Sequence, residues 1–360
     1  MSDSSKHNPG GLEIARRYLP VIALFAAVSV VVLLAWYVID VFFLAFAGIL
    51  LAITLRAPAT WLATRTRLSE GWALAVVIAA ILVALGITGW FFGHSLAGQF
   101  ATLARRVPEA VEKLRGYMAQ FDWLISPDAG REWLKNAGSM VGRGLTVVAA
   151  TFGVAANFVI VLFCGIFFAI QPALYLHGFL RLVPPARRQR LNEVIDASGH
   201  LLRRWVLGQL LLMLIIFVMT FVGLWLLGVP LPFALALIAG LLEFIPYLGP
   251  ILSAVPAVLV ALSDSPALAG YVILLYVGLQ SVEGYVLQPL IQQRAVDLPP
   301  ATVLLSQVIL GILVGAVGIM LATPVAATMM VAIQMLYIED VLGERNKTTA
   351  AQIPRGKSSR

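Results

Sequence analysis

The chain has 360 residues, of which 60% are hydrophobic and 12% are charged, and its formal net charge is +7. Soluble domains are about half apolar and about one quarter charged, so this composition excludes a water-soluble globular protein. The basic residues mark the ends of apolar stretches instead of forming one patch, so we expect no nucleic-acid partner.

Long apolar runs predict membrane-crossing helices, because a helix needs about 20 consecutive apolar residues to cross the hydrocarbon core. Uncharged runs of that order are Tyr18–Ile39, Gly71–Gly93, Gly144–Leu180 and Trp205–Leu242, and later runs flank Glu243 and Glu283. The alternating strands of an outer-membrane barrel are absent, so helices must satisfy the backbone in lipid. The predicted fold class is an all-α, polytopic helical membrane protein.

We expect three membrane segments within residues 18–92 and a fourth within residues 144–180. The predicted spans are Tyr18–Ile39, Val41–Leu55, Gly71–Phe92 and Leu145–Ile170. The first run has no small-residue cleavage site followed by polar sequence, so we interpret it as a retained helix. Cys164 is the single cysteine, so no intrachain disulfide can form.

Four basic segments fall on one side of the membrane in this arrangement. They contain 17 of the 25 lysine and arginine residues and are residues 1–17, 56–70, 181–204 and the region after Ile338. The positive-inside rule then places both termini in the cytoplasm. Residues 339–360 are expected to form a tail without ordered structure.

Residues 93–143 are expected to form a helical block outside the cytoplasm. The apolar positions in its first half are spaced by three or four residues, as on one face of a helix. They are Leu96, Phe100, Leu103, Val107, Val111, Leu114 and Met118. Charged residues fill the other face, so we interpret the segment as a solvated helix that packs on the protein or on a neighbouring subunit.

Residues 181–204 predict a basic amphipathic helix on the cytoplasmic side. Pro184 and Pro185 end the fourth segment, and an apolar stripe then runs from Leu191 to Trp205 beside several arginines. Such a pattern is typical of a helix that lies along the anionic inner leaflet, so membrane lipid is an expected partner.

The C-terminal core, residues 205–338, contains two similar apolar stretches. Pro232 and Pro256 are 24 residues apart, as are Pro300 and Pro324. Each stretch, Pro232–Leu262 and Ala301–Ile338, is interrupted by helix-breaking residues and is longer than one span needs. A long broken helix and a re-entrant hairpin both fit; we favour hairpins, which would make the two halves inverted repeats.

No enzyme signature is found in the sequence. There is no zinc-protease helix, no glycine-rich phosphate loop, no nucleophile turn and no histidine or cysteine pair at metal spacing. We therefore expect a protein that is not an enzyme and that has no cofactor and no metal site.

Carboxylates inside apolar sequence are the candidates for function. Glu243 directly precedes the break Pro246–Pro250, and Glu283 lies close to Gln280 and Gln288. An ionised carboxylate in mid-membrane costs several kcal/mol unless it is paired, hydrated or protonated, so such residues usually face a cavity or the bundle interior. A role for Glu243 only in holding helices together stays open as the alternative.

The break itself supports the cavity interpretation. Pro246, Gly249 and Pro250 free backbone carbonyls, which are tolerated at membrane depth where they line a polar cavity or bind a cation. Together with Glu243 and Tyr247 they form the predicted substrate or ion pathway.

Intramembrane amides and glycines are assigned to contacts between helices. Asn157, Gln209 and Gln307 are expected to hydrogen-bond between helices, and Gln209 is included among the candidate pathway residues. Gly311, Gly315 and Gly318 are expected to allow close helix packing, with a hinge as the less favoured option.

The sequence resembles the autoinducer-2 exporter family of bacterial permeases. The residues that carry the resemblance are Gly208-Gln209, Leu227-Gly228, the segment from Leu242 to Pro250, Glu283, Gln288-Pro289 and Pro299, and the core is a Pro-Tyr-x-Gly-Pro motif preceded by Glu. The resemblance implies about eight membrane segments, an extracytoplasmic helical block between the third and fourth, and homo-oligomers, with a pentamer as one option.

The resulting hypothesis is an inner-membrane exporter of a small polar signal or metabolite such as autoinducer-2. One alternative is a sodium (lithium)/proton antiporter, and another is a non-transporting oligomeric scaffold or channel. In the transporter readings a small molecule or an ion is the partner, and Glu243 and Tyr247 form the site with the assistance of Glu283.

Overall fold

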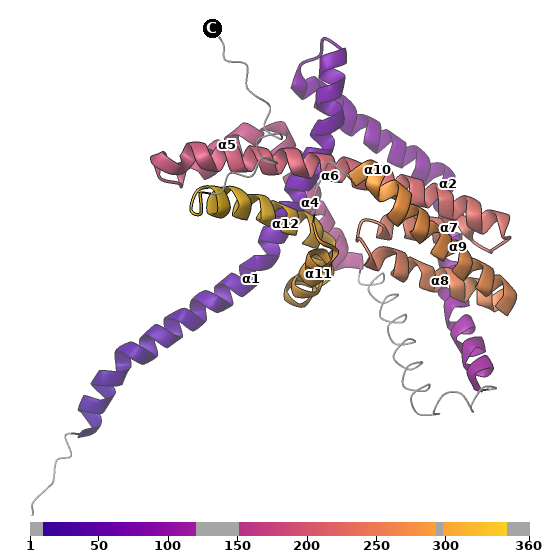
Figure 1. The fold of residues 1–360 in the computed structure, drawn as a ribbon, viewed down its shortest axis with the longest axis horizontal. Coiled ribbons are helices and arrows are strands. Elements are labelled where there is room, and N and C mark those ends of the chain that lie inside the picture. Colours follow the sequence, from indigo (N-terminus) through magenta and orange to yellow (C-terminus); the bar gives the residue numbers. More distant parts are fainter. Residues whose placement is uncertain (1–9, 120–150, 293–297, 344–360) are drawn as a thin grey trace, which may run out of the picture.

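The computed structural model describes residues 10–119, 151–292 and 298–343 (Figure 1), and every regular element in these ranges is a helix. Five helices in these ranges are long and apolar enough to cross a membrane, and a sixth span results if one bent helix pair is counted as one. The predicted all-α, polytopic membrane fold is therefore confirmed.

The spans expose most of their apolar side chains. They are Val38–Arg65, Glu70–Trp90, Pro185–Leu226, Pro266–Ile291 and Ala316–Glu339, and the bent pair is Asn157–Ile170 with Pro172–Arg181. A surface this rich in exposed leucine, valine and phenylalanine is expected of helices surrounded by lipid tails, because no such patch would be stable in water.

The first two predicted spans require correction, because the structure joins them in one helix. Helix α1 runs from Gly10 to Arg65 without a turn at Asp40. No proline or glycine stands between Ile39 and Val41, so nothing in the sequence ends the helix there. At about 1.5 Å per residue the helix is longer than the membrane is thick, and its first part extends away from the other helices in Figure 1.

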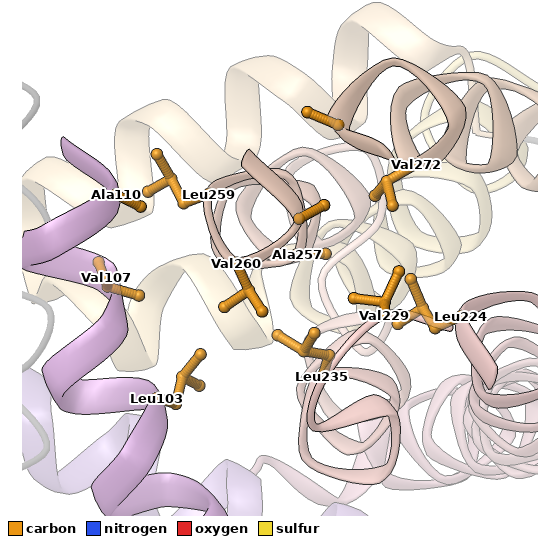
Figure 2. Packing of buried hydrophobic residues seen from close by; sticks show 12 residues of the cluster. Leu103, Val107, Ala110, Leu224, Val229, Leu235, Ala257, Leu259, Val260 and Val272 are labelled. Carbon is orange, nitrogen blue, oxygen red and sulfur yellow. The ribbon is translucent and has the colours of Figure 1, made fainter. Parts of the chain in front are cut away.

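Helix α2, Glu70–Ala119, continues the third span into the first part of the block predicted to lie outside the cytoplasm. Three of the apolar positions on this extension, Leu103, Val107 and Val111, face the end of α8, Leu248–Asp264. Leu103 and Val107 are buried in one cluster with Leu259 and Val260 (Figure 2). The predicted stripe thus packs on the chain itself, and its charged side also contributes, since Arg106 pairs with Asp264 at 3.5 Å. Phe100 is exposed, whereas Leu96 and residues 114–143 lie outside the described side chains.

Helices α4, Thr151–Ile170, and α5, Pro172–Arg181, meet at an angle of 89° and lead into α6, Pro185–Leu226. The apolar stripe at the start of α6 does not face lipid as the sequence suggested. Leu202 and Trp205 are buried against Leu50 of α1 and Leu321 of α12, Ala316–Ile333. Because the neighbouring helices cover this side, the exposed residues at the start of α6 are mainly polar or charged, among them Arg187, Glu193 and Asp196.

Each of the two proline-bounded stretches folds back on itself. In the first, α7 is Pro232–Leu242 and α8 follows the break, so Leu235 near the start of α7 packs with Val260 near the end of α8 (Figure 2). Helix α7 has 11 residues, too few to cross the hydrocarbon core at about 1.5 Å per residue. These contacts are those of the hairpin that the sequence analysis favoured.

The second stretch forms helix α11, Pro300–Val314, and helix α12. A side chain at Gly311 would come within 2.8 Å of Ile319, and one at Gly318 within 2.1 Å of the carbonyl oxygen of Leu310. Residues eight positions apart are too distant to touch within one straight helix, so the chain reverses between them. Gly315, with φ of +70°, makes the reversal. Two of the glycines thus lie at close contacts, whereas Gly315 forms the turn.

Helix α9, Pro266–Val282, connects the two hairpins. It continues through the π-helix η1, Glu283–Leu287, and helix α10, Gln288–Gln292. The chain ends its described part in the π-helix η2, Gln334–Glu339, which is fixed to the start of α6 because Arg190 pairs with Glu339 and Asp340 at 2.9 Å each.

Candidate functional site

The break between α7 and α8 has an unusual backbone conformation. Tyr247, which directly precedes α8, has φ of +66°. A tyrosine in the left-handed region carries backbone strain, and such strain persists where the surrounding structure fixes it. A side chain at Gly249 would lie 2.0 Å from the carbonyl oxygen of Leu242, so only glycine fits where the chain turns.

Two glutamines from other helices satisfy carbonyl groups of this break. Gln209 of α6 donates its side-chain amide to the carbonyl of Glu243 at 2.5 Å. Gln307 of α11 does the same for the carbonyl of Pro246 at 2.8 Å. Both amides are 1% exposed. An unpaired buried carbonyl costs about 1–3 kcal/mol. The two bonds therefore stabilise the non-helical conformation of the break.

The π-helix η1 arranges amides around the second carboxylate. The backbone N–H of Gln288 donates to the carbonyl of Glu283, five residues earlier, which is the π-helical pattern. The wider turn lets the Gln288 side chain reach the Glu283 carboxylate at 2.9 Å, and Gln280 donates to its other oxygen at 3.2 Å. Glu283 is therefore buried with both oxygens paired.

Glu243 and Glu283 line the same cavity. Both side chains are 2% exposed. The cavity has a volume of about 300 Å³. Its other lining residues come from α6, from the break, from η1 and α10, and from α11 and α12 with the segment before α11. They are Trp205, Gln209, Leu212, Pro246, Tyr247, Gly284, Gln288, Pro289, Leu298, Pro300, Val303 and Thr323.

Two polar atoms of the cavity lining have no hydrogen-bond partner within the described structure. They are the Oε2 atom of Glu243 and the hydroxyl of Thr323. A buried polar atom without a partner costs free energy, so such atoms in a cavity are available to a ligand, an ion or water.

The structure brings most of the predicted pathway residues to this cavity. Glu243, Pro246, Tyr247, Glu283, Gln288 and Gln209 line it. Gln280 does not, although it bonds to Glu283. Gly249 is buried behind the break, and Pro250 begins the first turn of α8 beside it.

Three contributors were not assigned to the site from the sequence. Gln307 was assigned only to helix contacts, Trp205 belongs to an apolar stripe, and Thr323 lies in an apolar run before Pro324. Gln307 carried a usable signal, because an amide in a membrane helix needs a partner and the break is the place where carbonyls lack one. Nothing in the spacing of Trp205 or Thr323 points to the cavity.

Several helices that could cross a membrane, two hairpins and a buried acidic cavity between them define a polytopic membrane protein with an internal polar site. The chain belongs to the AI-2E family of transporters, whose family model matches residues 24–338. The resemblance noted from the motif around Glu243 is thereby confirmed, and family membership places the chain among membrane transport proteins.

Three relatives are named as putative transport proteins. YrrI of Bacillus subtilis is 37% identical over 154 residues, which is 42% of this chain and 42% of the relative. YueF of Bacillus subtilis is 26% identical over 254 residues, covering 65% of this chain and 68% of the relative. MT0215 of Mycobacterium tuberculosis is 27% identical over 337 residues, covering 89% of each. The match to YrrI thus spans less than half of that protein, whereas the match to MT0215 spans most of it.

Proposed function

We propose that this protein is a secondary transporter of the bacterial inner membrane that exports a small polar solute, such as autoinducer-2, in exchange for a proton or a sodium ion. The observation that carries the proposal is that the buried carboxylates of Glu243 and Glu283 line one cavity beside a helix break. Two carboxylates in such a place repel each other unless a proton or a cation neutralises one of them. The binding of a proton or a cation to these carboxylates therefore depends on the ion gradient.

The two hairpins support alternating access. The end of α8 contacts the part of α2 that the positive-inside rule places outside the cytoplasm, through the pair Arg106 and Asp264. The end of η2 contacts the basic start of α6, through Arg190 and Glu339. The hairpins thus enter from opposite sides, and the cavity lies where the first meets α11, as in transporters built from inverted repeats.

The carboxylate pair also favours a second candidate, sodium (lithium)/proton antiport. Carboxylate and hydroxyl oxygens are suitable ligands for hard cations, and Glu243 and Thr323 each offer one without a protein partner. In this reading the cation itself is the substrate, and the proton competes with it for the same carboxylates.

Flux measurements in proteoliposomes test the proposal. Wild type, Glu243→Gln and the control Glu109→Gln are compared under imposed sodium and pH gradients, while internal pH and autoinducer-2 are followed. Glu109 is exposed on α2, far from the cavity residues in sequence, so its variant should behave like wild type. Sodium-driven proton movement that Glu243→Gln abolishes supports antiport, and gradient-driven release of autoinducer-2 supports export.

The third reading, a scaffold or channel without coupled transport, gives a different result in the same experiment. It predicts that Glu243→Gln assembles as wild type does and that neither gradient drives the uphill movement of a second species. That outcome would contradict the transporter proposal.

A further inference from the structure

We infer that the cavity at the helix break selects a small organic cation with an ammonium group and an apolar body. This inference rests on the proposed function only in taking the cavity as the place where the solute binds. It narrows the small polar solute of that proposal to an organic cation, so autoinducer-2, which has no ammonium group, would not be the preferred solute.

The charge of the lining is one-sided. Glu243 and Glu283 are acidic, and among the described residues that line the cavity none carries a positive charge. One shared proton would still leave a negative charge, and a buried charge without a counter-charge is costly. A cationic solute supplies the counter-charge, a neutral solute does not, and an anionic solute adds repulsion.

The size of the cavity exceeds what a bare metal ion needs. Its volume of about 300 Å³ corresponds to roughly ten molecules of liquid water. Volumes of this order are at the lower end for organic ligands, so the space accommodates a compact organic molecule.

Aromatic and aliphatic residues line the rest of the cavity. Trp205 and Tyr247 are both in the lining, together with Leu212 and Val303. The Trp205 ring is held by an edge contact to Phe244, with ring centroids 5.7 Å apart and an interplanar angle of 74°. Aromatic faces attract ammonium groups and also cover hydrocarbon, which suits a solute with both parts.

The two unpartnered oxygens specify the head group. When the Glu243 carboxylate is ionised, its Oε2 is an acceptor and not a donor of hydrogen bonds. The Thr323 hydroxyl can accept a hydrogen bond too. Both residues are more than nine-tenths buried. A primary ammonium has three donors, so it can satisfy acceptors on more than one side chain. Glu243 belongs to the first hairpin and Thr323 to the second, so such a solute would bridge the two.

Binding of three probes of equal shape tests the inference on the purified protein in detergent. Cyclohexylammonium, cyclohexanol and cyclohexanecarboxylate are titrated by calorimetry at pH 7 and low salt. We expect saturable binding of the cation, at least tenfold weaker binding of the alcohol and no binding of the carboxylate. Stronger binding of the alcohol or the carboxylate, or no saturable binding of the cation, would overturn the inference.

Variants at the two oxygens provide the controls. Thr323→Val should weaken binding of cyclohexylammonium severalfold, and Thr323→Ser should restore it. Glu109→Gln should bind as wild type does. Equal affinity of Thr323→Val and Thr323→Ser for the cation would contradict the assigned contact. A variant is included only if it elutes as wild type in gel filtration.

The inference and the proposed function can fail separately. Cation binding without gradient-driven flux would leave the inference intact and contradict the transporter. Gradient-driven flux of a neutral solute, with no cation binding, would support the transporter and contradict the inference.

Discussion

Gln307 and Pro246, 61 positions apart in the chain, are joined by a hydrogen bond of 2.8 Å from the Gln307 side-chain amide to the Pro246 carbonyl. This bond connects the second hairpin to the break in the first. Gln209 makes the matching bond to the Glu243 carbonyl from α6. The position of the Glu243 carboxylate therefore depends on two helices outside its own hairpin.

Replacing Gln307 should destabilise the break. Gln307→Leu keeps the side-chain volume but leaves the Pro246 carbonyl buried without a donor, at a cost of about 1–3 kcal/mol. We expect a lower midpoint of thermal unfolding in detergent and reduced flux. Asn157→Leu is the control, because Asn157 is an exposed amide within α4. Equal unfolding midpoints for the two variants would show that the Gln307 bond contributes nothing.

The two glutamines that bond to Glu283 should differ in importance. Gln288 lines the cavity and makes the shorter bond, whereas Gln280 is exposed and does not line it. Hydrogen bonds to charged groups contribute about 1.5–3 kcal/mol, so Gln288→Ala should lower kcat/KM for transport roughly tenfold or more. Gln280→Ala should have a clearly smaller effect. A larger loss of kcat/KM in Gln280→Ala than in Gln288→Ala would mean that the carboxylate oxygen bonded to Gln280, away from the cavity, is the one that matters for transport.

The glycines of the second hairpin should respond in different ways to alanine. Gly318→Ala places a methyl group 2.1 Å from a backbone oxygen, which cannot move without shifting α11, so we expect a loss of folded, monodisperse protein. Gly315→Ala meets no atom within 4 Å but has to adopt φ of +70° with ψ of −143°, a conformation that favours glycine strongly, at a cost of about 1–3 kcal/mol. Gly270→Ala in α9, where nothing lies within 4 Å, should be tolerated. Normal yield of Gly318→Ala would contradict the close contact between α11 and α12.

Cysteine labelling should reveal the hairpins. In a Cys164→Ser background, single cysteines at the exposed positions Leu226 and Asp264 flank the first hairpin, and Ala301 and Val341 flank the second. We expect Leu226 and Asp264 to react with an impermeant maleimide from outside the cell, and Ala301 and Val341 to react only after permeabilisation. Labelling of Leu226 and Asp264 from opposite sides would mean that the first stretch crosses the membrane.

Much of the fold follows from local sequence, because apolar length and helix-breaking residues act locally. The break at Pro246–Pro250 and the cavity position of Glu243 could be predicted for this reason. The continuity of α1 through Asp40 could not, since one charged residue resembles a loop in a hydropathy pattern but does not end a helix.

The composition of the site depends on contacts between distant segments. The sequence shows Glu243 and Glu283 as isolated charges 40 residues apart, and only the packing of α9 against the first hairpin brings them together. Thr323 and Trp205 enter the site in the same way. Their side chains are ordinary for membrane helices, so no local pattern distinguishes them.

The most direct test of the account is a double-mutant cycle on gradient-driven flux with Glu243→Gln, Glu283→Gln and the combined variant. If the two carboxylates act as one unit, each single substitution lowers kcat/KM strongly. The kcat/KM of the combined variant is then no lower than that of the less active single variant. Wild-type flux in either single variant, or a combined loss equal to the product of the two single losses, would contradict it.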